Sequence, residues 1–88
     1  MTRIAKYKGC PVTDWLETQG LSLQDFALLM DVGYTDVYIM ARGYTRVLPL
    51  RFQNAIEKRA GAATAQRVAE AYTVWRHGLS AQIGKARA

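Results

Sequence analysis

The sequence predicts an all-α fold, a compact bundle of about five short helices, and three observations support this class. Apolar residues recur at the helical spacing i, i+3, i+4 along most of the chain. Strict alternation of apolar and polar residues over five or more positions, the pattern typical of strands, is missing. Glycine and proline stand where the helical segments begin or end. Half of the residues are hydrophobic, which is enough for a small packed core.

The first two predicted helices carry start signals. One begins near Pro11, where a missing N–H costs nothing, and ends at Gly20. The next begins at Ser22, whose hydroxyl can cap it, with Asp25 three residues later as in a capping box. Gly33 breaks this pattern. The apolar face of the second helix comprises Leu23, Phe26, Ala27 and Met30.

The third helix is predicted over about Tyr34–Ala41, with Val37 and Met40 facing inward. Only residues 31–33 join it to the second helix, so the two helices cross steeply and need a small residue where they touch. Ala27 is placed to supply that contact. The outward face of the third helix then carries Tyr34, Thr35, Tyr38 and Arg42.

Two more helices complete the predicted bundle. The fourth runs over about 49–59 and stops at Gly61, and the fifth runs over about 64–77 with Gly78 as its stop. The apolar residues of the fourth helix are Leu50, Phe52, Ala55 and Ile56, and those of the fifth are Val68, Ala71, Tyr72 and Trp75.

Charge divides the chain into a domain and two ends. Residues 1–10 are expected to form a basic arm, residues 11–79 one domain, and residues 80–88 a flexible basic tail. The bases of the arm are Arg3, Lys6 and Lys8. Twelve Lys and Arg against seven Asp and Glu give a net charge of +5, a surplus that favours polyanionic partners such as nucleic acid.

Composition also bears on location and chemistry. No apolar run approaches the roughly 18–20 residues of a membrane span, and the N-terminus lacks the apolar block of a signal peptide. The single cysteine, Cys10, fits a reduced compartment, so we expect a cytoplasmic protein without membrane contact. Cys10 and the single histidine, His77, form no metal-ligand pattern, and no phosphate-binding or nucleophile motif occurs. We therefore expect no enzymatic activity, cofactor or metal.

The segment LSLQDFALLMDVGYTDVYIMARG, residues 21–43, resembles the helix-turn-helix of the lambda-repressor and Cro-like (XRE-type) regulators. The resemblance covers about residues 13–61. The matching features are Ala27 in the second helix, Val32 in the turn, the inward Val37 and Met40, and the closing Arg42-Gly43. It implies a lambda-repressor-like fold whose third helix enters the DNA major groove.

Three positions depart from the pattern of this family. Leu23 stands where the family usually has a Gln that touches the DNA backbone, although Gln24 follows it. Asp31 replaces the usual turn glycine. Asp36 puts an acid close to where phosphate would lie, at a cost of about 1 kcal/mol in a solvated setting; alternatively it stabilises the positive N-terminus of its helix.

These observations together define the predicted sites. Base contacts are expected from Tyr34, Thr35, Tyr38 and Arg42. Contacts with the DNA backbone are expected from Gln24, Tyr44, Arg46 and Arg51 and from the arm residues Arg3, Lys6 and Lys8. Such regulators act as two-fold dimers on paired half-sites, and the predicted seam of a homodimer is Tyr72, Trp75 and Leu79.

The leading hypothesis is a sequence-specific regulator of transcription, a repressor of the phage or plasmid type, that binds a palindromic operator in double-stranded DNA. The alternative is the same fold used as a protein-interaction module: an antitoxin, an anti-repressor or a polymerase-binding factor. The acidic, tyrosine-bearing stretch 31–38 favours that alternative, in which Tyr34, Tyr38 and Ile39 form a patch for a protein partner. RNA binding is a weaker third hypothesis, because no aromatic-bearing sheet is predicted.

Overall fold

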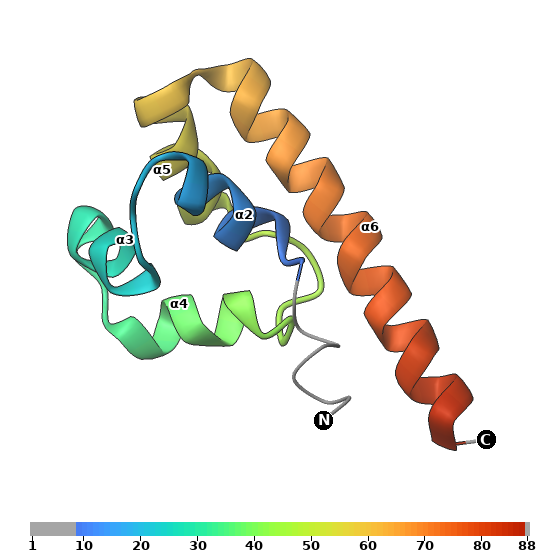
Figure 1. The fold of residues 1–88 in the computed structure, drawn as a ribbon. Coiled ribbons are helices and arrows are strands. Elements are labelled where there is room, and N and C mark those ends of the chain that lie inside the picture. Colours follow the sequence, from blue (N-terminus) through green and yellow to red (C-terminus); the bar gives the residue numbers. More distant parts are fainter. Residues whose placement is uncertain (1–8, 88) are drawn as a thin grey trace.

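The computed structural model describes residues 9–87, and Figure 1 shows their arrangement. This part of the chain is all-α and contains five helices and no strand. The helices are α2 (Pro11–Thr18), α3 (Leu23–Met30), α4 (Tyr34–Ala41), α5 (Leu50–Ala60) and α6 (Ala62–Arg87). The predicted fold class is confirmed, and the bounds of the first four helices agree with those predicted. The arm residues Arg3, Lys6 and Lys8 lie outside the described residues.

The starts of α2 and α3 follow from local chemistry. Pro11 occupies the first position of α2, where its fixed φ fits the helix. At α3 the capping box is complete: the Asp25 N–H donates to Ser22 Oγ at 3.0 Å, and the Ser22 N–H donates to Asp25 Oδ2 at 2.9 Å. Two backbone donors that the helix leaves unpaired are thereby satisfied.

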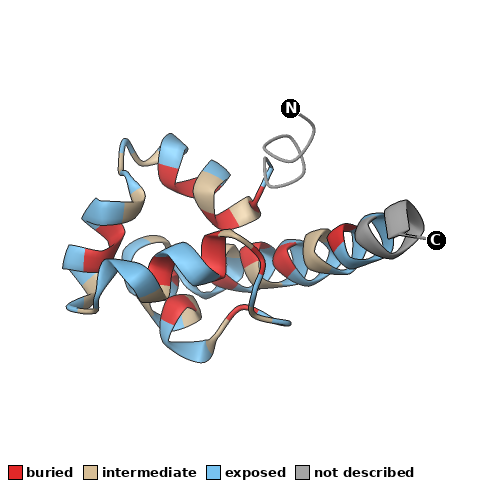
Figure 2. Cartoon of the chain, turned by 90° about the horizontal axis from the view of Figure 1, so that it is seen from below, coloured by how far each residue is buried: buried red, intermediate tan, exposed pale blue. Residues whose placement is uncertain are grey.

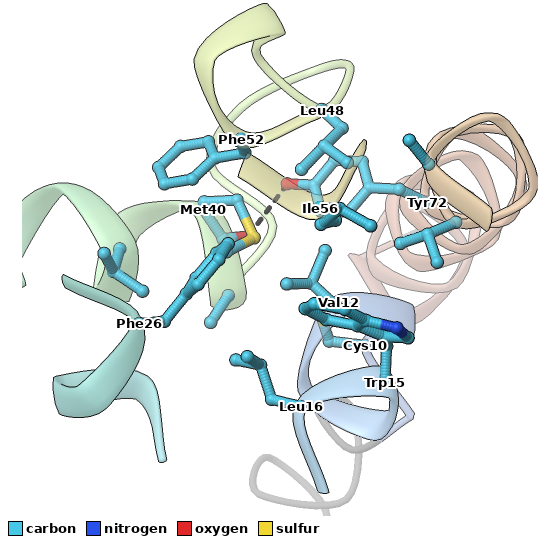
Figure 3. Packing of buried hydrophobic residues seen from close by; sticks show 14 of the residues in the cluster. Cys10, Val12, Trp15, Leu16, Phe26, Met40, Leu48, Phe52, Ile56 and Tyr72 are labelled. Carbon is cyan, nitrogen blue, oxygen red and sulfur yellow. Dashed lines mark hydrogen bonds between the residues drawn. The ribbon is translucent and has the colours of Figure 1, made fainter. Parts of the chain in front are cut away.

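The core lies where α2, α3, α4 and α5 meet the inner face of α6 (Figure 3). Phe26 packs near two other aromatic residues of the core, with its ring centroid 6.3 Å from that of Trp15 and 6.0 Å from that of Phe52. The four other helices also contribute fully buried side chains, which include Val12, Leu16, Val37, Met40, Ile56 and Tyr72. Two residues predicted on apolar faces, Leu50 and Ala71, are instead exposed.

The last helix is longer than predicted. We expected it to stop at Gly78 and to be followed by a flexible tail over 80–88, but α6 continues through Gly78 to Arg87. A glycine inside a helix costs only about 1 kcal/mol, and the alanines, Gln, Lys and Arg that follow it are good helix formers. At about 1.5 Å per residue, its 26 residues span about 39 Å, so α6 sets the 42 Å long axis of the molecule. Its C-terminal half projects beyond the other helices (Figure 1).

Candidate nucleic-acid interface

The turn between α3 and α4 consists of Asp31, Val32 and Gly33. Asp31 adopts the left-handed conformation, with φ 56° and ψ 47°, and ends α3. Among residues other than glycine, aspartate is one of the few that enter this region readily. The Val32 N–H then donates to the Ala27 carbonyl oxygen at 3.0 Å. An aspartate therefore makes a turn in which a glycine was the expected residue, and this departure leaves the short connection intact.

The inner side of α4 is fixed against the core as predicted. Val37 and Met40 are fully buried, and Ala27 of α3 is buried beside them. Val32 in the turn is partly buried and packs against the same cluster. Because these apolar contacts hold α4 from within, the rotation of α4 about its axis is set and its opposite face is directed to solvent.

The outer face of α4 carries a row of three side chains one turn apart. Tyr34 and Tyr38 are 43% and 38% exposed, and their ring centroids are 6.0 Å apart. Arg42 is half-buried, lies with its guanidinium carbon 5.2 Å from the centre of the Tyr38 ring, and donates a hydrogen bond to the Tyr38 hydroxyl. Thr35 is exposed beside them. Figure 2, in which the molecule is seen from the α4 side, shows the exposed positions along this helix. The four predicted base-contacting residues therefore share one accessible surface.

Asp36 and Arg51 form an ion pair that the sequence analysis did not anticipate. Asp36 lies in the first turn of α4, and its Oδ2 is 3.4 Å from Nη2 of Arg51 on α5. Both side chains are about half exposed. An exposed pair of this kind contributes about 0.2–1 kcal/mol, so it can exchange for another partner at small cost. The pair neutralises the one acid on α4 and engages Arg51, which was predicted to contact phosphate.

The remaining predicted backbone-contacting residues are exposed at other points. Tyr44 and Arg46 lie on the loop that leaves α4, and Gln24 lies in the first turn of α3. Gly43 begins that loop with φ +82°, a conformation that glycine adopts without strain. The chain thus follows the Tyr34–Tyr38–Arg42 row directly with an exposed loop that carries an arginine.

The structure corrects the predicted dimer seam of Tyr72, Trp75 and Leu79. Tyr72 is fully buried and Leu79 is 6% exposed, so both face this chain's own core and present no surface to a second copy. Trp75 is half-buried, with its ring 5.4 Å from that of Tyr72. The three residues do lie on the apolar side of α6, but the loop after α4 of the same chain covers that side. The sequence carried no signal for this contact, because the segments are about 30 residues apart.

The buried ionisable groups lie away from the outer face of α4. Burial raises the pKa of the Cys10 thiol above its ordinary value of 9.0, and it raises the pKa of the Tyr72 hydroxyl above 10.0. Both groups are therefore neutral near pH 7. Among residues 9–87, no group of His, Cys, Asp and Glu is arranged to hold a metal ion, and no helix is long and apolar enough to cross a membrane.

Comparisons with protein-family models, with curated proteins and with solved structures found no match to this chain. The function is therefore proposed from the residues and the geometry described above.

Proposed function

We propose that this chain is a sequence-specific regulator of transcription, a repressor of the phage or plasmid type, that inserts α4 into the major groove of double-stranded DNA. One observation carries the proposal: the exposed Tyr34 and Tyr38 and the half-buried Arg42 form a row on the solvent-facing side of a helix whose other side is locked into the core. Eight residues at about 1.5 Å each make α4 about 12 Å long, which suits a groove about 12 Å wide.

In this arrangement the chemistry of the row suits base edges. Arg42 can donate to the O6 and N7 acceptors of guanine. Because its contact with the Tyr38 ring already restricts its rotamers, the side chain loses less conformational entropy on binding. The tyrosine hydroxyls can donate or accept, and their rings can pack on a thymine methyl group. Thr35 adds a hydroxyl and a methyl group at the same surface.

Attachment to the DNA backbone is assigned to the arginines that follow α4. Arg46 is exposed on the loop, and Arg51 can leave Asp36 for a phosphate because an exposed ion pair is weak. The net charge of +5 draws the chain toward DNA at a distance. We further propose a cytoplasmic protein that binds a palindromic operator as a homodimer, through a surface other than the buried side chains of Tyr72 and Leu79.

The proposal is tested by selecting bound duplexes from a random pool and titrating the selected duplex at several salt concentrations. We expect a defined, palindromic site and an affinity that falls steeply as salt rises. Arg46→Ala should weaken binding to all duplexes and reduce the salt slope by about one. Arg67→Ala is the matched control, because Arg67 is an exposed arginine in the second turn of α6, and α6 begins at the end of the molecule away from α4 (Figure 1). A pool that yields no preferred sequence would contradict the proposal.

A second candidate is the protein-interaction module, and exposed apolar surface on α3 favours it. Leu28 is 80% exposed and Leu29 is 57% exposed. Leu29 and Met30 also line a hollow of about 490 Å³ between α3 and α5. Exposed apolar clusters of this type mark protein contacts. If this function is the correct one, with the partner on α3 and not on the predicted patch of Tyr34, Tyr38 and Ile39, Leu29→Asp abolishes partner binding, Tyr38→Ala has a smaller effect, and no duplex is selected.

A further inference from the structure

Three side chains of α6 hold the segment by which the chain leaves α4. The Tyr72 hydroxyl oxygen is 2.8 Å from the Met40 carbonyl oxygen, 2.8 Å from Thr45 Oγ1 and 3.1 Å from the Thr45 carbonyl oxygen. Figure 3 shows the Tyr72 hydroxyl directed at Met40. Tyr72 is fully buried, so water does not compete for these bonds. One side chain thus bonds to the last turn of α4 and to the middle of the following loop.

The protons in this cluster can be assigned. The Tyr72 hydroxyl has a single proton, and both carbonyl oxygens near it can only accept, so that proton is directed to the carbonyls. The Thr45 hydroxyl must then donate to the Tyr72 oxygen. Loss of the Tyr72 hydroxyl would remove one donor from the Met40 carbonyl, which also accepts from the Gly43 N–H, and would leave the half-buried Thr45 hydroxyl without this acceptor, at a cost in stability.

Gly43, between these two anchor points, is pressed against the next turns of α6. A Cβ atom at position 43 would lie 2.9 Å from Leu79 Cδ2 and 3.2 Å from Trp75 Cη2. A side chain at position 43 would therefore require Leu79 to shift, in addition to the strain of the left-handed backbone at φ +82°. Hydrogen bonds on both sides of Gly43 and van der Waals contact at Gly43 itself fix the path of residues 40–45 relative to α6.

The path of residues 40–45 determines the positions of two arginines. Arg42 lies between the Met40 carbonyl and Gly43, and Arg46 follows Thr45 directly. We propose that Tyr72, with Trp75 and Leu79, is a positioning residue for the phosphate-contacting loop: α6 sets the position of Arg46 against the DNA backbone and that of Arg42 toward the base edges. This inference rests on the proposed function. It gives the three residues predicted as a dimer seam a different role, one exerted within a single chain.

The test compares Tyr72→Phe with Val68→Ala. Val68 is a buried residue one turn before Tyr72 on α6, and because its side chain has no polar atom, its truncation destabilises the fold without removing a hydrogen bond from residues 40–45. Both variants are titrated with the selected duplex well below their melting temperatures. For Tyr72→Phe we expect a salt slope shallower by about one, at about 0.9 per lost phosphate contact, and an affinity about tenfold weaker for all duplexes. Val68→Ala should keep the slope of the parent.

A second variant and a second measurement make the outcome decisive. Thr45→Val removes the other hydroxyl of the cluster, should produce the same shallower slope, and should add little when combined with Tyr72→Phe. Amide hydrogen exchange without DNA should be faster at Gly43 and Tyr44, whose N–H groups donate to the Met40 and Ile39 carbonyls, in both variants. If the parent selects no duplex, the proposed function is overturned, and so is the role of α6 in positioning arginines for DNA. Amide exchange then still tests whether Tyr72 and Thr45 hold the loop after α4. Parent-like slopes in Tyr72→Phe and Thr45→Val, with DNA binding intact, would overturn the inference alone.

Discussion

The two ends of α4 are held in different ways. At its start, the backbone of the turn makes local bonds: the Asp31 N–H donates to the Leu28 carbonyl oxygen at 3.2 Å, and the Val32 N–H donates to that of Ala27 at 3.0 Å. At its end, the Tyr72 hydroxyl reaches Met40 and Thr45 from 32 and 27 residues away in sequence. The backbone hydrogen bonds before α4 are therefore local, whereas those that hold its end depend on the packing of α6. The structural effects of substitutions after α4 should extend to α6, and those of substitutions before α4 should remain local.

The largest effect is expected at Gly43. Gly43→Ala combines a left-handed backbone with a clash against Leu79, and it should lower the free energy of unfolding by about 3 kcal/mol. Gly20→Ala is the matched control, because Gly20 also has a positive φ, of +71°, but nothing within 4 Å of its Cβ position. Its cost should be about 1 kcal/mol, that of the backbone alone. Urea unfolding of both variants measures the difference. Equal losses would show that α6 does not constrain the end of α4.

Alkaline pH should lower the free energy of unfolding, because two groups buried near α6 lose their protons more readily in the unfolded chain. The pKa values of Cys10 and Tyr72 are raised by burial above 9.0 and 10.0, so their contribution is fully present below pH 9. Above pH 9 the unfolded chain loses the Cys10 proton while the folded chain keeps it, so stability falls as pH rises toward the folded pKa. The slope is at most about 1.4 kcal/mol per pH unit for each group. Cys10→Ala should remove the loss between pH 9 and 10 in unfolding experiments, and an unchanged pH profile would refute this assignment.

A smaller effect is expected at the start of α3. Ser22→Ala removes the capping hydroxyl from the Asp25 N–H and should cost about 1 kcal/mol of unfolding free energy. Ser80→Ala, an exposed serine inside α6, serves as the control and should change stability by less than about 0.5 kcal/mol. Because the bond is local, the DNA salt slope should stay that of the parent. A shallower slope in Ser22→Ala would break the distinction between the two ends of α4.

The smallest change in stability is expected at the ion pair between α4 and α5. Asp36→Asn loses a half-exposed pair with Arg51 and should cost no more than about 0.5 kcal/mol. It should nevertheless bind the selected duplex about fivefold more tightly, because a carboxylate beside phosphate is removed and Arg51 is released. Asp14→Asn, an exposed carboxylate on α2, should leave affinity unchanged. Weaker binding by Asp36→Asn would mean that Asp36 itself contacts DNA.

The parts of the fold that the sequence predicted are those decided by neighbouring residues. Ser22 and Asp25 identify the start of α3, Pro11 that of α2, and the period of Val37 and Met40 identifies the buried side of α4. Such signals need only a few residues of sequence. They were sufficient to place Tyr34, Thr35, Tyr38 and Arg42 on one exposed face.

The remaining features depend on contacts between distant segments. Pairing of Asp36 with Arg51 requires the angle between α4 and α5, and the burial of Tyr72 requires the path of the loop. A glycine in a helical segment also has two outcomes: Gly61 ends α5, whereas Gly78 lies within α6 because its neighbours favour the helix. Local propensity does not distinguish these cases.

The most direct test of the central claim is a titration of the duplex selected from a random pool with the parent and with Tyr38→Ala, each at several salt concentrations. If α4 reads DNA, the parent prefers its selected duplex over a scrambled one and loses affinity steeply with salt. Tyr38→Ala, which changes the centre of the exposed row, should lose that preference and keep the salt slope to within about one. Equal affinity of the parent for the selected and scrambled duplexes, or binding that is flat with salt, would contradict the claim.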